Sequence, residues 1–333
     1  MITYNSIMSM KATSAPIFST LIFLLCFSST VLSVSFTKIP LPLKATGPEA
    51  FAFLSRAGDF LTGVADGRVL KLVSQARRFE DFGFFAPNRS KLCNGRVNDP
   101  NCGRPLGLAL HHATKRLYVC DAFYGLGVLE GEGGLGTILS SGADGQRYRL
   151  CDGLDVHQQT GDVYFTDASS NYDIRQIPLA VAKNDSTGRL LKYDFNTKQV
   201  TVLLRNLSGP GGVAVDKDAQ FVLVSEFIIG RTIKFWLKGP KANTYDIINS
   251  QPMPDNVKRT ESGNFWLAAV KRNLTTLFLP IPIGQLVKAS GSVLKTVDFG
   301  PWYGVIPVSE VQECQGKLYL GSMFAPFVGV YKD

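Results

Sequence analysis

Short runs of hydrophobic and polar positions alternate along most of this chain. The apolar runs are about four to eight residues long, they end at Gly, Asp or Asn, and within them apolar and polar residues follow the two-residue period of a strand with one buried face. Helical spacing is scarce, and it predicts one short turn near residues 177–182. The pattern therefore predicts an all-β protein.

The strand pattern also repeats. Each copy has an apolar strand, a polar turn with Gly or Asp, and a second strand rich in aromatic and β-branched residues. The copies start about 45–60 residues apart, at Ala50, Gly107, Gly153, Gly212, Asn256 and Glu310. Repeats of this kind indicate a β-propeller, in which four-stranded blades surround a channel that binds ligands at one mouth. A β-sandwich is the structural alternative, but it does not explain the repetition. We predict a six-bladed β-propeller.

The first 33 residues follow a different pattern. Lys11 is the only charged residue before an apolar run from Ala15 to Val34, and the small residues Val31 and Ser33 occupy the −3 and −1 positions of a cleavage site. This order is typical of a secretory signal peptide. A retained signal anchor is the alternative, because the run approaches the ~20 residues that span a bilayer. The Ser/Thr-rich second half favours cleavage, so we predict a signal peptide over 1–33 and one propeller over 34–333, with no stable membrane span.

The chain is basic, with a formal net charge of +8. Its Lys and Arg residues are scattered, whereas nucleic-acid-binding proteins gather them in a patch or stripe. The charge therefore predicts no nucleic-acid partner.

Secretion makes the cysteines and asparagines informative. Cys93 and Cys102 flank a polar loop of the kind that a disulfide closes in an oxidising compartment. Cys120 and Cys151 lie in apolar strand-like runs, where cysteines more often behave as small buried hydrophobes. Four sequons predict a glycoprotein. Their asparagines are Asn88, Asn184, Asn206 and Asn273.

The repeats resemble those of strictosidine synthase and its plant strictosidine synthase-like relatives over about residues 45–332. The matching stretches include Gly47-Pro-Glu-Ala, Cys102-Gly-Arg-Pro-Leu-Gly, Val163-Tyr-Phe-Thr-Asp, Thr187-Gly-Arg-Leu-Leu-Lys-Tyr-Asp and Leu318-Tyr-Leu-Gly-Ser. The resemblance implies a six-bladed propeller and a disulfide between the two cysteines that flank the polar loop. It also implies residence in the vacuole, with the extracellular space as the alternative.

The chain departs from the synthases at the position of their catalytic residue. Those enzymes join an amine to an aldehyde, and a glutamate in an apolar pocket, where its pKa is raised, moves the protons. Alignment on Val311-Gln-Glu places Ser309 at this position. Serine without an adjacent base takes no proton near neutral pH. A pocket histidine is replaced by Pro307 and a pocket tyrosine by Asp152, so strictosidine synthesis is not expected.

Glu310 directly follows the altered position. Adjacent strand residues point to opposite faces, so we expect Glu310 to point away from the channel. A local β-bulge that turns it inward is the alternative.

The resemblance also extends to calcium-dependent lactonases and esterases, which hold a cation on the channel axis with oxygen ligands from separate blades. Glu49 matches their first ligand, Asp152 stands at an Asn position, and Asp255 and Asn256 match the last element, whereas Gly211 offers no side chain. Ca²⁺ is the cofactor that this set implies. The alternative is an acidic cluster that makes turn hydrogen bonds and binds a cationic or hydroxylated ligand without metal.

These features leave three functions open. We expect a hydrolase of small esters or lactones, whose metal would polarise a carbonyl and activate water. A non-catalytic binder of small molecules at the channel mouth and a retained strictosidine synthase are the alternatives.

Overall fold

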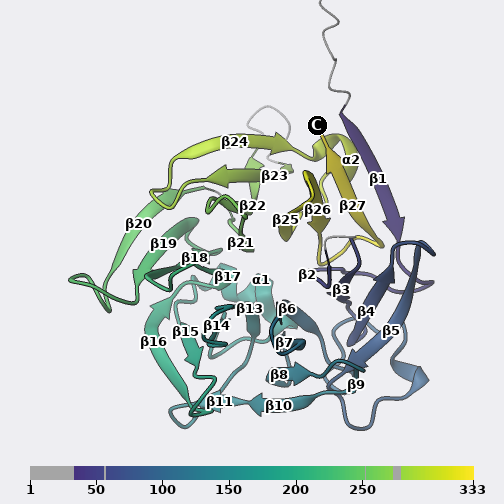
Figure 1. The fold of residues 1–333 in the computed structure, drawn as a ribbon, viewed down its shortest axis with the longest axis horizontal. Helices are drawn as coiled ribbons and strands as arrows, with labels where there is room; N and C mark the ends of the chain where they lie inside the picture. The colour runs from purple at the N-terminus through teal and green to yellow at the C-terminus, as the bar shows by residue number, and fades with distance from the viewer. Residues whose placement is uncertain (1–33, 56–57, 252, 273–278) are drawn as a thin grey trace, which may run out of the picture. The chain divides into compact units, whose positions relative to one another are not determined.

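The computed structural model describes residues 34–55, 58–251, 253–272 and 279–333. Over these residues the chain forms six small, mainly antiparallel sheets arranged in a ring (Figure 1). This arrangement confirms the six-bladed β-propeller. The predicted signal peptide over 1–33 and the sequon at Asn273 lie outside the described residues.

Each blade has four antiparallel strands, and in the first blade the short β9 (Gly134–Leu135) adds a fifth, parallel strand. The first strand of each blade lies nearest the centre of the ring (Figure 1). The innermost strands are β2 (Phe51–Phe53), β6 (Pro105–His111), β13 (Cys151–Val156), β17 (Pro210–Val215), β21 (Val257–Arg259) and β25 (Glu310–Cys314). The second strands are β3 (Phe60–Gly63), β7 (Arg116–Asp121), β14 (Val163–Asp167), β18 (Phe221–Glu226), β22 (Phe265–Arg272) and β26 (Lys317–Gly321). The innermost strands begin within a few residues of the six predicted repeat starts, so the repeat unit is one blade.

The outer halves of the blades complete the sheets. The third strands are β4 (Arg68–Val73), β8 (Gly125–Leu129), β15 (Gly188–Tyr193), β19 (Arg231–Trp236), β23 (Pro280–Val287) and β27 (Phe327–Lys332). The outermost strands are β5 (Arg78–Phe84), β10 (Thr137–Ser140), β16 (Val200–Leu207), β20 (Tyr245–Ser250), β24 (Val293–Asp298) and β1 (Ser35–Pro40). The remaining elements are β9 (Gly134–Leu135), β11 (Gly142–Ala143), β12 (Gln146–Arg147), the short helices α1 (Ile177–Ala182) and α2 (Gly300–Tyr303), and the 3₁₀ turns η1 (Lys91–Cys93) and η2 (Ile174–Gln176). The predicted helical turn is thus confirmed as α1.

The two ends of the described chain close the ring. β1 pairs antiparallel with β27, from Ser35 opposite Lys332 to Pro40 opposite Phe327. The last blade therefore contains one strand from the beginning of the propeller and three from its end (Figure 1). Backbone hydrogen bonds between β1 and β27 thus complete the last blade, and the chain continues from β1 into the first blade.

Glycine lets the innermost strands approach one another closely around the channel. A Cβ added at Gly107 would lie 2.3 Å from Asp152 O, and one at Gly153 would lie 2.2 Å from Gly211 O. Real Cβ atoms do not approach backbone atoms so closely, so these positions need glycine for packing. Three of the innermost strands, β6, β13 and β17, therefore carry glycine at Gly107, Gly153 and Gly212, where they contact the next blade.

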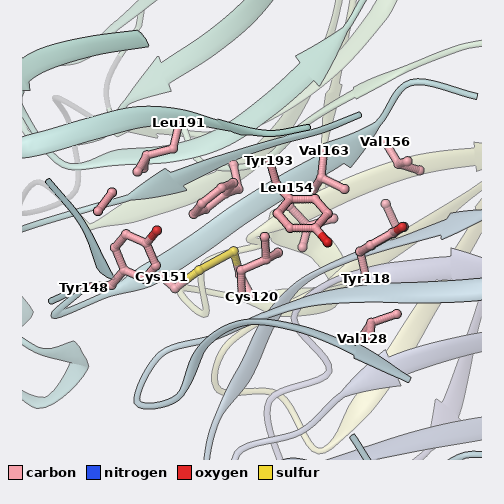
Figure 2. Packing of buried hydrophobic residues seen from close by; sticks show 14 residues of the cluster. Tyr118, Cys120, Val128, Tyr148, Cys151, Leu154, Val156, Val163, Leu191 and Tyr193 are labelled. Atoms are coloured by element: carbon pink, nitrogen blue, oxygen red, sulfur yellow. A yellow bond between two sulfur atoms is a disulfide. The ribbon is translucent and has the colours of Figure 1, made fainter. Parts of the chain in front are cut away.

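The blades pack through apolar side chains, and a disulfide lies in one of these cores. Leu154, Val163 and Phe165 belong to a buried cluster that also contains residues of β7, β8 and β15. Figure 2 shows the disulfide between Cys120 and Cys151 within this cluster, and it joins β7 of one blade to β13 of the next. The interpretation of these two cysteines as small buried hydrophobes was therefore incomplete, because both side chains are buried but they are bonded to each other.

The predicted disulfide between Cys93 and Cys102 is confirmed. Within the part of the chain that the structure describes, Cys314 is the cysteine that belongs to neither disulfide. Two disulfides are compatible with a protein of the secretory pathway.

The disulfide between blades should contribute more to stability than the loop disulfide. We expect a Cys120→Ser/Cys151→Ser double variant to lose about 4 kcal/mol of unfolding free energy, because its bond closes a longer loop in the unfolded chain, with a sequence separation of 31 residues. The matched control is Cys93→Ser/Cys102→Ser, whose separation is 9 residues. Its loss should be about 1 kcal/mol smaller. Urea unfolding measures both, and a larger loss in the loop variant would contradict the prediction.

Three of the four sequon asparagines lie among the described residues. The sequon residues Asn88, Asn184 and Asn206 are exposed, as attachment of a glycan requires. Their glycosylation stays a prediction. None of the helices in the described ranges is long and apolar enough to cross a membrane.

Candidate functional site

One residue from each blade occupies the same place, at the start of the innermost strand. These residues are Glu49, Leu106, Asp152, Gly211, Asp255 and Ser309. Hydrogen bonds link neighbouring blades at this level. Asn256 N, next to Asp255, donates to Ser309 O at 2.9 Å, and Ser309 Oγ donates to Glu49 O at 3.2 Å. The structure therefore brings the predicted site residues to one mouth of the channel.

Two β-bulges place Asp152 and Gly211. The pairing register shifts at the start of β13 and at the start of β17, which leaves the amide groups of Gly153 and Gly212 outside the strand ladder. Buried hydroxyls accept these hydrogen bonds, Thr166 Oγ1 from Gly153 N at 3.0 Å and Ser225 Oγ from Gly212 N at 2.8 Å. Thr and Ser on the second strands thus fix the bent ends of the innermost strands.

Glu49 is the most buried member of the acidic cluster that it forms with Asp152 and Asp255. Its side chain is buried, and Asn256 Nδ2 donates to Glu49 Oε1 at 3.3 Å. No hydrogen-bond partner among the described residues reaches Glu49 Oε2. Burial raises the pKa of Glu49, and the charges of Arg104 and Lys258 and the bond from Asn256 offset part of this rise. Of the three acids, Glu49 has the most surrounding groups that favour its ionised form.

Asp152 and Asp255 lie at the more open side of this cluster, where both are partly exposed. Burial raises the pKa of each well above its ordinary value, and the charge of Glu49 raises both further. The charge of Asp255 also raises the pKa of Asp152, whereas Arg104 lowers it. Among the described residues, no cation offsets the raised pKa of Asp255, which is lowered only by a backbone hydrogen bond involving Asn256. These carboxyls are therefore suited to hold protons at pH values where ordinary aspartates are ionised.

Arg104 is the cation of the site, and sequence analysis did not single it out. It is 1% exposed, although it is one of the largest side chains of the protein. Its Nη1 donates to Gly47 O at 2.8 Å, and its backbone N donates to Asp121 Oδ2 at 2.8 Å. Gly47 has a φ of +75°, and a Cβ there would lie 2.9 Å from Arg104 Nη2. The Gly47-Pro-Glu and Cys102-Gly-Arg motifs thus form one unit, in which glycine makes room for the guanidinium.

This donor set does not fit a calcium ion. In the ranges that the structure describes, no group of three or more His, Cys, Asp or Glu side chains is arranged to hold a metal. Arg104 already places a positive charge against Glu49 and Asp152. A Cβ at Gly211 would lie 3.3 Å from Asp255 Oδ1, so Asp255 lies beside the position that offers no ligand. Calcium binding stays a prediction, and this geometry does not favour it.

The side chain of Ser309 and the carbonyl of Pro307 make backbone and side-chain hydrogen bonds at the start of β25. Ser309 is 1% exposed, its N–H donates to Gly321 O at 2.9 Å, and its hydroxyl is bonded to Glu49 O. Pro307 O accepts a hydrogen bond from Ser322 Oγ at 2.7 Å. Neither residue presents a base to the channel mouth.

Glu310 does not point away from the channel as expected. Its carboxyl lies between the innermost strands of three blades, where Phe51 N donates to Oε1 at 2.8 Å and Lys258 Nζ lies 3.3 Å from Oε2. Burial raises its pKa to about 7. Pairing with β26 is regular at this position, so no bulge is involved. The side chain faces the adjacent blade, but because the innermost strands converge, that direction also leads toward the channel axis.

A six-bladed propeller with buried and half-buried carboxyl groups at one channel mouth defines the class of this protein, and comparison with known proteins gives the family. The chain is 44% identical to Strictosidine Synthase-Like 11 of Arabidopsis thaliana, over 94% of this chain and 97% of that protein. It is 34% identical to strictosidine synthase of Catharanthus roseus, over 89% and 87%. A family model described as strictosidine synthase matches residues 152–240. The chain belongs to the strictosidine synthase-like family.

Solved structures share the fold at low sequence identity. A gluconolactonase from Xanthomonas campestris superposes with a TM-score of 0.65 at 15% identity, covering 90% of this chain and 89% of that one. A luciferin-regenerating enzyme superposes with a TM-score of 0.62 at 12% identity, covering 90% and 96%. These likenesses support the propeller and do not extend to activity.

Proposed function

We propose that this protein hydrolyses small carboxylic esters or lactones at the channel mouth formed by Asp152 and Asp255. The observation that supports this most is the pair itself: two partly exposed carboxyl groups, both with strongly raised pKa values, next to one buried carboxylate and one buried guanidinium. Carboxyl groups of this kind carry out general acid–base catalysis, because one can hold a proton while the other accepts one.

The charges around the pair assign the two roles. Arg104 favours the ionised form of Asp152, so Asp152 is the general base. No comparable cation stabilises ionised Asp255, and the charges of Glu49 and Glu310 oppose its ionisation, so Asp255 is the general acid. The charge of Glu49 raises the pKa of both aspartates, and the charge of Asp255 raises that of Asp152, so the two side chains are not expected to ionise together. Like charges at short distance separate the proton affinities of such a pair.

The reaction then balances with water as the only co-reactant. Asp152 takes a proton from water as the water oxygen forms a bond to the carbonyl carbon, and Asp255 donates its proton to the carbonyl oxygen. The tetrahedral intermediate collapses with cleavage of the carbon–oxygen bond of the ester, and the leaving oxygen takes the proton that Asp152 now holds. As the carbonyl re-forms, a hydroxyl of the intermediate returns its proton to Asp255, so both carboxyl groups regain their starting protonation states. One carboxylic acid and one alcohol, or one hydroxy acid from a lactone, are the products.

The activities named for two similar proteins bear on this proposal. One propeller with the same fold is named a gluconolactonase, so the architecture accommodates lactone hydrolysis, although a shared fold does not carry an activity across. Another relative is named strictosidine synthase. At Ser309 the present chain has a hydroxyl bonded to Glu49 O instead of a base, and this favours hydrolysis over the condensation.

The test is an activity screen of the mature protein against small esters and lactones, with tryptamine plus secologanin as the comparison reaction. We expect saturable hydrolysis of at least one ester or lactone and no condensation product. Because the donor set does not fit a metal, the rate should be the same with a chelator and with added Ca²⁺. Chelator-sensitive hydrolysis would overturn the metal-free mechanism, and ligand-induced stabilisation without turnover would show a binding protein instead.

A further inference from the structure

A cavity is lined by residues that follow the acidic cluster along the innermost strands. Its volume is about 200 Å³, and its lining residues include Phe53 of β2, Leu110 of β6, Asp155 of β13 and both Lys258 and Arg259 of β21. Asp155 follows Asp152 by three residues on β13, which corresponds to about 10 Å along a strand. The cavity is therefore separate from the acidic cluster of Glu49, Asp152 and Asp255.

Two neighbouring cations line this cavity. Lys258 is already engaged, since its Nζ donates to Leu108 O at 3.4 Å and lies 3.3 Å from Glu310 Oε2. Arg259 donates through Nε to Val215 O at 3.2 Å, which fixes the plane of its guanidinium. The two terminal nitrogens of Arg259 form no hydrogen bond or ion pair with any described residue. Arg259 thus has its paired donors available to the cavity.

The carboxyl groups near these cations are held by their own backbone partners. Asp155 Oδ1 accepts from Val156 N at 2.8 Å, and Asp155 Oδ2 accepts from Val215 N at 2.9 Å. Glu310 Oε1 accepts from Phe51 N at 2.8 Å. Neither carboxyl forms an ion pair with Arg259, although burial raises the pKa of Asp155 and the charges of Lys258 and Arg259 offset part of this rise. The terminal nitrogens of Arg259 therefore have no direct carboxylate partner among the described residues and can donate to an anion in the cavity.

The remaining walls set the size and polarity of an occupant. Phe53, Leu110, Ala52 and Ala109 contribute apolar surface, and His112, Gln158 and Gln312 contribute polar groups. A dry cavity of about 150 Å³ holds a benzene molecule, so this cavity has room for one aromatic ring and a carboxylate. An apolar body with one charged end matches both kinds of wall.

We propose that this cavity is a binding site for small organic monoanions, in which a carboxylate on an aromatic or compact apolar body pairs with Arg259. The planar guanidinium presents two parallel N–H groups that suit both oxygens of a carboxylate. Lys258 adds a second positive charge beside the first. This site does not depend on the hydrolytic function, because Arg259, which would bind the anion, takes no part in the proposed hydrolysis.

Phenylacetate is the probe, and isothermal titration calorimetry measures its binding to the mature protein. We expect one saturable site and at least tenfold weaker binding in Arg259→Gln. Arg259→Lys should show an intermediate loss, because lysine keeps the positive charge but lacks the two parallel N–H donors. Phenylacetamide should bind at least tenfold more weakly than phenylacetate to the wild type, because it has no charge. Arg259→Lys keeps the test decisive if Arg259→Gln does not fold.

Two controls locate the site. Arg78→Gln removes the same charge from an exposed side chain at the rim, and it should leave phenylacetate binding unchanged. Asp255→Asn should also leave it unchanged, whereas that variant loses hydrolysis, so failure of one proposal is separable from failure of the other. No saturable binding of phenylacetate, equal binding of the neutral amide, or an equal loss in Arg78→Gln would overturn the proposal.

Discussion

Asp255→Asn should lower kcat for ester hydrolysis by about 10²–10⁴ while KM changes little. Asparagine keeps the size of the side chain and its hydrogen bonding, but it has no proton to give to the carbonyl oxygen. The wild-type rate should also fall as pH rises past the raised pKa of Asp255, because the general acid is then ionised. In Asp255→Asn this upper limb of the pH profile should be absent from the residual rate. Steady-state kinetics across pH measure both effects.

Two further variants show whether the effect belongs to the pair. Asp152→Asn removes the base and should cost a similar factor, but it should keep the upper limb, since Asp255 is intact. Asp246→Asn is the matched control, because Asp246 lies on the outermost strand β20 and bonds Trp236 Nε1 and Lys241. Its rate should equal that of the wild type. Full activity of Asp255→Asn would remove the carboxyl pair from the mechanism.

Arg104→Gln should destabilise the protein by about 3–5 kcal/mol, because removal of one partner leaves buried carboxylates without compensation. Arg104 is buried beside Glu49 and Asp152, and its guanidinium also holds the Gly47 carbonyl. Glutamine can replace part of the hydrogen bonding but none of the charge. Urea unfolding near neutral pH measures the loss.

The pH dependence of Arg104→Gln separates charge from packing. Without the guanidinium, the pKa of folded Asp152 rises further above its unfolded value of 3.8, so the folded variant binds more protons than the unfolded chain. Stability then decreases as pH rises from about 4 toward the raised pKa. The deficit of the variant should therefore be smaller near pH 4 than near pH 7. Arg78→Gln, an exposed control, should lose less than about 0.5 kcal/mol. A pH-independent deficit in Arg104→Gln would indicate lost packing alone.

The blade architecture was predictable from the sequence alone. Strand-length alternation and the repeat period depend on local backbone geometry, and they located all six innermost strands. The closeness of Cys93 and Cys102 was also predictable, since a short loop joins them. Position within the repeat placed Glu49, Asp152, Asp255 and Ser309 at equivalent points, because each residue just precedes or begins an innermost strand.

The contacts between residues on different blades depend on tertiary packing and were not predictable from the sequence. Cys120 and Cys151 are bonded because two blades pack face to face, and no local pattern encodes that pairing. Arg104 reaches the carbonyl of Gly47, 57 residues earlier in the chain, and Glu310 reaches Phe51 N across 259 residues. A repeat period fixes how a strand alternates within its own blade. It does not fix where converging strands place their charged side chains, since the partners of these groups lie on other blades.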